Sequence, residues 1–277
     1  MAAVSARWAI PWAVGSGRDE TNVGKTEMRW MRDERGKGRI RAMKTIGLIG
    51  GMSWESSAAY YRIINQEVAR HLGGMHSAQS LMFSVDFAEV EALQHQGRWD
   101  EATARMIEAA QRVERGGADC VLLCTNTMHR MADDVQGSIA IPLLHIADAT
   151  GARVHAQGVT TVGLLGTRFT MEGDFYRGRL RERYGLAVLI PDVEERQVVH
   201  EVIYRELVLG QVRPASRDVY KRAIAHLVAR GAQGVILGCT EIMLLITQAD
   251  SPVPVFDTTT IHAQAAVAYA LAPARPT

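Results

Sequence analysis

The sequence predicts an α/β protein made of two similar lobes, each a parallel sheet flanked by helices. Short apolar runs closed by glycine or polar residues alternate with longer amphipathic stretches, which is typical of parallel sheets covered on both faces. The pattern then begins again, because TVGLLG at 161–166 resembles TIGLIG at 45–50. RGAQGVILGCT at 230–240 likewise resembles RGGADCVLLCT at 115–125. Matches at two separate places predict that the two halves share one architecture.

In the first half, four apolar runs bounded by turn residues are expected to be strands. They cover residues 44–51, 80–85, 120–124 and 141–145. Helices are expected where apolar residues recur every three to four positions. These helices cover residues 55–72, 88–95 and 99–115, and others begin at about Thr127 and Asp148.

The second half repeats this order of elements. Strands are expected at 161–166, at the end of the second repeat near 239, and at 253–256; helices are expected at 194–209 and 217–229. A last helix, at about 259–271, is apolar along most of one side and is expected to pack back on the first half. The expected lobes are therefore residues 43–150 plus 258–272, and residues 151–257.

The composition favours a globular protein of the cytoplasm. Of 277 residues, 47% are apolar and the net charge is +1, so neither nucleic acid nor another polyanion is an expected partner. The longest apolar stretches are about seven residues, whereas a membrane span needs ~20. Three cysteines, an odd number in a long chain, do not indicate a disulfide framework and favour a reducing compartment.

Residues 1–42 differ from the rest, with nine Lys/Arg against five Asp/Glu. The segment 29–41 has no sustained apolar period, and 9–14 is too short and proline-broken for a signal peptide. We expect a basic extension that is disordered or precedes the true start at Met43. Contact of this arm with nucleic acid is the less favoured alternative.

Two cysteines stand at matching places in the repeat. Cys124 and Cys239 each end an expected strand before an expected helix, and we align them with one another, 115 residues apart. Backbone N–H groups and the helix dipole favour a thiolate at such a position. Cys120 lies in mid-strand among Val and Leu and is expected to be structural. A substrate between the two matched thiols could lose a proton to one and gain a proton from the other.

Polar residues directly after the two cysteines are candidate substrate ligands. Thr125, Asn126 and Thr127 follow Cys124, and Thr240 follows Cys239. Hydroxyl and amide donors at a helix start suit a carboxylate or phosphate, although such residues also cap helices routinely. The loop GGMSW, which contains Met52, lacks both the P-loop and the dinucleotide-binding spacing, so no nucleotide cofactor is implied.

Two further side chains near the cysteines have open roles. His129 either orients the site or is a structural histidine, and Glu241 either holds a substrate ammonium group or caps a helix. No His/Cys spacing resembles a zinc site, so no metal is expected. Cys-His nucleophilic hydrolysis is possible, but it would not require a second thiol.

At these residues the chain resembles the aspartate/glutamate racemase family, the cofactor-independent amino acid racemases. KTIGLIGGMSWESS at 44–57 resembles the family's first strand and loop, CTNTMH at 124–129 its first catalytic motif, and GCTEI at 238–242 its second. The resemblance extends over about residues 43–271 and is closest to the subgroup that opens with GGMSWES. It implies two pseudo-twofold-related lobes with four-stranded parallel sheets, an active site in the cleft between them, and a homodimer.

The resemblance also implies roles for individual residues. One of Cys124 and Cys239 removes the Cα proton of an amino acid, and the other returns a proton to the opposite face. Thr125, Asn126 and Thr127 match the family's α-carboxylate site, to which Thr240 contributes from the other lobe. The further substrate contacts that we expect are Met52, Gln94 and Glu241.

The chain departs from the family at positions that would contact the substrate side chain. Aspartate-specific relatives have an arginine at the position of Phe87 and a lysine at that of Val208. Without these cations, strict specificity for aspartate or glutamate is not expected, and a neutral or broader range of amino acids is favoured. The alternatives are a hydantoin racemase, a maleate isomerase or an arylmalonate decarboxylase of the same scaffold, or a catalytically silent amino-acid-binding protein.

Overall fold

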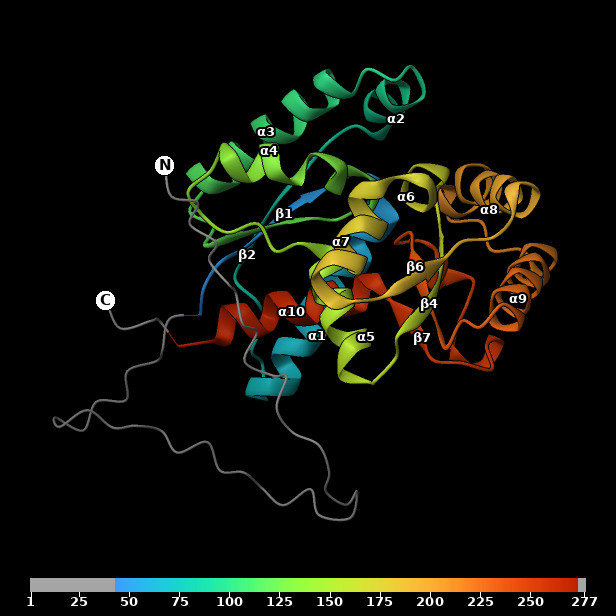
Figure 1. Cartoon of the computed structure of the whole chain (residues 1–277). Helices are drawn as coiled ribbons and strands as arrows, with labels where there is room; N and C mark the ends of the chain where they lie inside the picture. The colour runs from blue at the N-terminus through green and yellow to red at the C-terminus, as the bar shows by residue number, and fades with distance from the viewer. Residues whose placement is uncertain (1–42, 274–277) are drawn as a thin grey trace, which may run out of the picture. The chain divides into compact units, whose positions relative to one another are not determined.

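The computed structural model describes residues 43–273; the expected basic extension at 1–42 lies outside the described residues. In the described part, strands and helices alternate and form two parallel sheets, which confirms the α/β prediction. Figure 1 shows α3 and α4 on one side of the strands β1 and β2, with α1 and α10 on the other. This is the two-sided cover that a parallel sheet requires.

The first sheet has the strand order β2-β1-β3. Its strands are β1 (Ile46–Gly50), β2 (Ser80–Ser84) and β3 (Cys120–Leu123). The helices of this lobe are α1 (Trp54–Leu72), α2 (Phe87–His95), α3 (Trp99–Arg115), the 3-10 helix η1 (Thr127–Met131) and α4 (Ala132–Gly137). Side chains along β3 alternate between two cores: Val121 and Leu123 pack with α3, whereas Leu122 packs with α1 and α10.

The fourth expected strand of the first lobe, residues 141–145, forms a single bridge between Val121 and Leu143. The Val121 amide donates to the Pro142 carbonyl, and the Leu144 amide donates to the Val121 carbonyl, both at 2.9 Å. The Leu144 carbonyl then accepts from His262 Nε2 at 2.7 Å, and α5 (Ile146–Ala156) begins two residues later. The first sheet is therefore three strands with a bridged edge segment.

The second sheet has four strands in the order β5-β4-β6-β7. They are β4 (Thr161–Gly166), β5 (Ala187–Leu189), β6 (Gly234–Gly238) and β7 (Val255–Asp257). The helices of this lobe are α6 (Arg168–Glu172), α7 (Asp174–Tyr184), α8 (Val193–Arg205) and α9 (Pro214–Ala229), with the 3-10 helices η2 (Leu207–Leu209), η3 (Ile242–Leu244) and η4 (Gln248–Asp250). No expectation from the sequence covered β5, α6 or α7, which are short or strongly charged.

Helix α10 (Thr258–Leu271) connects the two sheets. It begins directly after β7 of the second sheet, yet its Ala263 and Val267 side chains pack with Leu48 of β1 in the core of the first lobe. Near its end, the Ala270 carbonyl accepts from the Lys44 amide at 3.2 Å. Figure 1 shows α10 lying beside α1.

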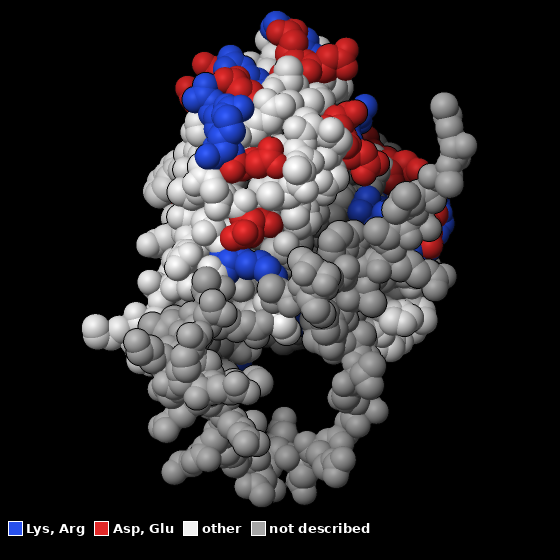
Figure 2. Space-filling model, turned by 90° about the vertical axis from the view of Figure 1, so that its left-hand side faces the viewer, with Lys and Arg blue, Asp and Glu red and all other residues white. Residues whose placement is uncertain are grey.

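The surface of the described residues shows no separation of charge on the face that Figure 2 presents. Lys/Arg and Asp/Glu side chains are interleaved there. Exposed ion pairs among the described residues include Arg112–Glu108 within α3 at 2.6 Å, and Arg105 of α3 with Glu89 of α2 at 3.1 Å. In the part of the chain that the structure describes, no helix has the length and hydropathy that crossing a membrane requires.

Candidate functional site

The hydrogen-bond register of the two sheets shows which residues of the two lobes correspond. Strands β1 and β4 carry the repeats TIGLIG and TVGLLG, so Ile46 corresponds to Val162. Ile46 pairs with Cys120 of β3, and Val162 pairs with Gly234 of β6. Cys120 therefore corresponds to Gly234, which follows it by 114 residues. The same offset is found outside the sheet pairs: the Val121 amide donates to the Pro142 carbonyl, and the Val235 amide, 114 residues later, donates to the Pro254 carbonyl.

When this register is continued along the chain, the residue of the first lobe that corresponds to Cys239 is Thr125 and not Cys124. The sequence alignment of the two cysteines at 115 residues was thus one residue out of register, because it followed shared letters rather than backbone pairing. A slip of one residue turns each side chain to the other face of its strand. The position that corresponds to Cys124 is Gly238.

The environment of Cys124 agrees with this register. Its side chain is fully buried in the core between the first sheet, α1 and α10, where Tyr60 also lies. Burial raises the pKa of the Cys124 thiol, whereas the sequence had predicted a helix dipole that favours thiolate. The helix that follows, η1, is a 3-10 segment of five residues. The structure thus gives Cys124 a place in the core and does not bring it to the candidate site.

A narrow cavity, partly open to solvent, lies between the two lobes. Its walls combine residues of the first lobe, mainly the loop after β1, α2 and the segment after β3, with residues of α8 and the segment after β6. The lining residues are Met52, Phe87, Gln94, Thr125, Asn126, Thr127, Thr167, Ile203, Tyr204, Val208, Gly238, Cys239 and Glu241. Of the residues expected from the sequence, Cys124 and Thr240 are missing from this lining.

Cys239 and Glu241 form a buried pair in the second lobe. The Cys239 thiol donates to Glu241 Oε2 at 2.9 Å, and the Thr240 hydroxyl donates to the same oxygen at 3.0 Å. Burial and the neighbouring Glu241 carboxylate raise the pKa of the Cys239 thiol. In the free protein this environment keeps Cys239 protonated.

The other oxygen of Glu241 reaches across to the first lobe. Ser53, in the loop after β1, donates to Glu241 Oε1 from its hydroxyl at 2.8 Å and from its amide at 3.3 Å. Glu241 is 2% exposed, and none of its hydrogen-bond partners among the described residues is a cation. A buried carboxylate without a cation is costly unless a ligand supplies one.

The segment after β3 presents hydroxyl and amide groups to the cavity. Asn126 Nδ2 donates to the Thr258 hydroxyl at 3.1 Å, while Asn126 Oδ1 is buried and has no hydrogen-bond partner in the described structure. Thr127 Oγ1 lies 3.0 Å from Thr167 Oγ1 of the second lobe. Asn126 Oδ1 is thus an acceptor that a ligand can use, since unpaired buried polar atoms are rare.

Aromatic and aliphatic side chains form the rest of the wall. Phe87 stacks on Tyr204 with ring centroids 6.4 Å apart, and the Tyr204 hydroxyl donates to Gln94 Oε1 at 3.0 Å. These contacts join α2 of the first lobe to α8 of the second. Phe87 and Val208 both line the cavity, and among the described lining residues there is no Lys or Arg. The sequence did not indicate Tyr204, and it indicated Ser53 and Thr167 only as members of loops after strands and not as substrate contacts.

The fold and the cavity together define a two-lobed α/β enzyme with its candidate site between the lobes. The chain belongs to the Asp/Glu/hydantoin racemase family, whose model matches residues 49–266, and it is an isomerase of the amino-acid racemase class. The family prediction from the sequence is thereby confirmed.

Known proteins with similar chains include both solved structures and a curated enzyme. A Yersinia pestis protein assigned to the Asp/Glu racemases is 53% identical, with a TM-score of 0.77, over 83% of this chain and 100% of the other. An aspartate racemase homologue from Pyrococcus horikoshii is 35% identical, with a TM-score of 0.70, over 82% and 99%. A broad-specificity amino-acid racemase from Bacillus subtilis is 24% identical over 62% of this chain and 74% of its own.

Proposed function

We propose that the protein racemises amino acids by exchanging the Cα proton between the two walls of the cavity, with Cys239 on one wall and Thr125 on the other. The observation that carries this proposal is the shared register of the two residues in their sheets, combined with the presence of both in the cavity lining. A pseudo-twofold arrangement of this kind presents one group to each face of a planar carbanion. It replaces the pair of cysteines expected from the sequence.

The groups around the cavity fit the zwitterion of an amino acid. The Glu241 carboxylate and the unpaired Asn126 Oδ1 are acceptors suited to the α-ammonium group. The Thr127 hydroxyl is a donor suited to the α-carboxylate, while the Thr125 hydroxyl faces Cα. The ammonium group would supply the cation that the buried Glu241 lacks.

The reaction needs stabilisation of the carbanion as well as two proton carriers. When the substrate ammonium group pairs with Glu241, the Cys239 thiol is released from this carboxylate and loses its proton to solvent. The resulting thiolate takes the proton from Cα, and the electron pair left behind delocalises into the bound carboxylate. The Thr125 hydroxyl then gives its proton to the opposite face of Cα. Return of the thiol proton to the threonine oxygen through solvent restores the enzyme. A hydroxyl is a far weaker acid than a thiol, so exchange at the Thr125 face is the slower one.

The side-chain part of the cavity favours neutral amino acids over acidic ones. Its wall consists of Phe87, Tyr204, Ile203 and Val208 and offers no cation to a second carboxylate. Aliphatic and small polar side chains would fit such a wall without leaving a charge unpaired. The breadth stated in the name of the Bacillus subtilis relative supports a range of substrates rather than one.

A panel of L- and D-amino acids in deuterium oxide tests this function. We expect deuterium at Cα and the appearance of the opposite enantiomer, measured by mass spectrometry and chiral chromatography, for neutral amino acids at rates above those for aspartate and glutamate. Absence of exchange with all twenty amino acids would refute the racemase proposal. Cys239→Ala is the control, in which exchange should be slower by about 10²–10⁴-fold.

We also propose that the protein acts as a homodimer in the cytoplasm. Trp54 and Tyr61, seven residues apart on one face of α1, are 66% and 56% exposed, which is unusual for large apolar side chains and suits an interface between copies. All three cysteines are free thiols, which supports a reducing compartment. Sedimentation velocity of the wild type and of Trp54→Glu/Tyr61→Glu tests the dimer.

A further inference from the structure

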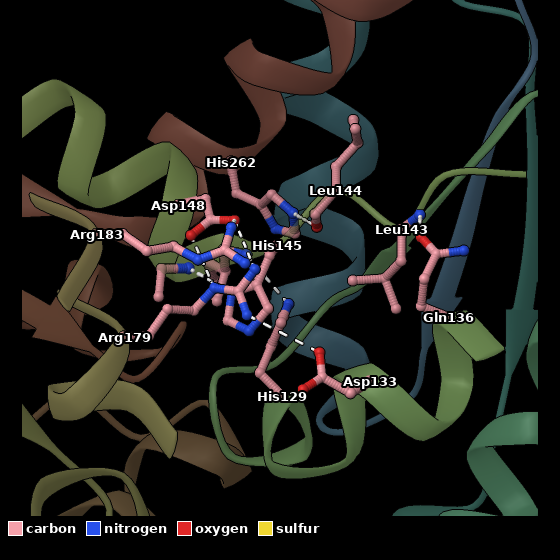
Figure 3. Close-up of polar contacts among 12 residues, drawn as sticks. His129, Asp133, Gln136, Leu143, Leu144, His145, Asp148, Arg179, Arg183 and His262 are labelled. Atoms are coloured by element: carbon pink, nitrogen blue, oxygen red, sulfur yellow. Dashed lines mark hydrogen bonds and ion pairs between the residues drawn. The ribbon is translucent and has the colours of Figure 1, made fainter. Parts of the chain in front are cut away.

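Three buried histidines, His129, His145 and His262, form a cluster next to the segment that carries Thr125. The rings of His129 and His145 are 4.4 Å apart, and those of His129 and His262 are 5.8 Å apart. Figure 3 shows this cluster beside Asp148, Arg179 and Arg183. Within residues 43–273, no group of three or more His, Cys, Asp or Glu side chains is arranged to hold a metal ion. None of the three histidines lines the cavity.

The hydrogen bonds of His129 define its protonation state and its connections. The Ile146 amide, at the start of α5, donates to His129 Nε2 at 3.1 Å, so Nε2 carries no proton. Nδ1 must therefore carry the proton, which it donates to the Thr125 carbonyl at 2.8 Å. A neutral ring thus joins the backbone of Thr125 to the first residue of α5.

We propose that His129 is a positioning residue for Thr125: its Nδ1–H holds the Thr125 carbonyl and thereby aims the Thr125 hydroxyl at Cα. This inference rests on the proposed racemase function. Peptide 125–126 follows the end of β3 and precedes η1, so no strand partner or α-helical turn holds it in place. A carbonyl held at 2.8 Å by a fully enclosed ring restricts the peptide rotation that would swing the side chain away.

Helix α5 provides a rigid support for this clamp. Asp148 of α5 forms a two-pronged ion pair with Arg179 of α7, with both N–O distances at 2.7 Å, and it also accepts from Arg183 at 3.1 Å. Figure 3 shows these contacts on the side of α5 near His145. Since α7 belongs to the second lobe, the clamp fixes Thr125 relative to the lobe that carries Cys239.

The two proton-transfer positions are thus held in different ways. At the offset of 114 residues, the position of His129 is occupied in the second lobe by Met243, which cannot form this clamp. Cys239 is instead held through its thiol by Glu241. A carbonyl clamp leaves the Thr125 hydroxyl free for substrate, whereas the Cys239 thiol must leave Glu241 before it reacts.

Two substitutions of similar size separate the two bonds of His129. In His129→Asn, the amide nitrogen replaces Nδ1 and keeps the bond to the Thr125 carbonyl, while the Ile146 amide loses its acceptor. In His129→Gln, the amide oxygen replaces Nε2 and keeps the bond to Ile146, while the Thr125 carbonyl is released. Each variant keeps one of the two hydrogen bonds of the buried His129 ring and loses the other, so we expect similar decreases of Tm in thermal unfolding.

The activities of the two variants are expected to differ. For His129→Gln we expect a loss of about 10²-fold in kcat with KM within about threefold, because a small displacement of a reacting group is costly. For His129→Asn we expect kcat within about threefold of the wild type. His145→Asn is the matched control: it changes a histidine of the same cluster that has no bond to Thr125, and its amide oxygen can still accept from the Ala147 amide at the start of α5. Its kcat should remain close to that of the wild type. Equal kcat losses in both His129 variants, or none in His129→Gln, would overturn the proposal.

Hydrogen exchange separates failure of this inference from failure of the proposed function. In the intact chain, amides of residues 125–128 should exchange faster in His129→Gln than in His129→Asn, whatever the substrate is. If the wild type racemises no amino acid but this difference is found, the racemase proposal fails and the clamp remains. If the wild type is active and amide exchange is the same in both variants, the clamp is refuted.

Discussion

Thr125 and Cys239 occupy the same register position in the two sheets, although they are different residue types. This correspondence follows when the pairing of β1 with β3 and of β4 with β6 is continued past the strand ends, and both residues line the cavity between the lobes. Cys124, one residue earlier, belongs to the core. The symmetry of the fold is therefore retained while the chemistry of its two walls differs.

The two cysteines should respond differently to removal. Cys239→Ala is expected to decrease kcat/KM by about 10²–10⁴-fold, since it removes a general acid–base group. Cys124→Ala is expected to leave kcat/KM within about threefold and to decrease the free energy of unfolding by about 1 kcal/mol, the usual effect of truncating a buried side chain. Chiral chromatography and urea unfolding measure the two quantities. Comparable loss of turnover in both variants would restore the two-cysteine mechanism.

Replacing Thr125 by Cys is expected to give the cavity two matched thiols. Because a thiol is a much stronger acid than a hydroxyl, kcat should increase or be retained, and Thr125→Val should lower it by about 10²-fold or more. Deuterium incorporation into recovered substrate and into product, measured separately, reports which face reacts. An active Thr125→Val variant with normal exchange at both faces would contradict the role of Thr125.

Glu241→Gln is expected to raise KM by about 10–100-fold, the effect of losing a hydrogen bond from a cation to a buried carboxylate. Thr240→Val is the control, because it removes a neighbouring donor to the same oxygen and keeps the charge. Initial rates over a range of substrate concentrations distinguish KM from kcat. The ammonium role of Glu241 would be wrong if KM rose equally in both variants.

Val208→Lys should shift specificity towards acidic amino acids. Val208 lines the cavity, so an ammonium group there can pair with a side-chain carboxylate, and the ratio of kcat/KM for glutamate to that for alanine should rise about tenfold or more. Leu209→Lys places the same charge on the adjacent residue, which is 63% exposed and outside the cavity lining. An equal change of this ratio in the two variants would mean that only net charge matters.

The histidine cluster predicts a loss of stability in acid. Burial lowers the pKa of His262 to about 4, and burial lowers the pKa of His129 and His145 well below the ordinary value. The unfolded chain, whose histidines titrate near ~6.5, then binds more protons than the folded one, so stability falls as the pH decreases from about 6.5 to about 4. Urea unfolding at a series of pH values measures this slope. In His262→Gln the slope of the free energy of unfolding against pH should be smaller by the contribution of one bound proton. An unchanged slope would contradict the prediction.

Local patterns predicted elements better than they predicted register. Helix α3 has the expected bounds, Trp99–Arg115, because apolar residues recur at helical spacing and two glycines follow. The alignment of Cys124 with Cys239 was wrong by one residue, since both choices match similar letters and only backbone pairing distinguishes them. Segment 141–145 has the apolar pattern of a strand, yet pairing there ends after one bridge.

The sequence indicated residues of the cavity lining where they belong to motifs, and it missed contacts between residues that meet only through the fold. Asn126, Thr127 and Glu241 follow strand ends, so sequence position alone indicated them. The bond from Ser53 to Glu241 joins residues 188 positions apart, and that from Tyr204 to Gln94 joins residues 110 apart. No local periodicity encodes such contacts, because they depend on how the lobes meet.

The position of α10 has a consequence for biosynthesis. This last helix completes the core around β1, and its Ala270 carbonyl bonds the Lys44 amide at the opposite end of the described chain. Domains emerge from the ribosome N-terminal end first, at about 5–20 residues per second. The lobe whose strands are synthesised first therefore waits, with an apolar face uncovered, until α10 has been synthesised. The first lobe is thus begun before the second lobe, but its core is completed only after the strands of the second sheet have been made.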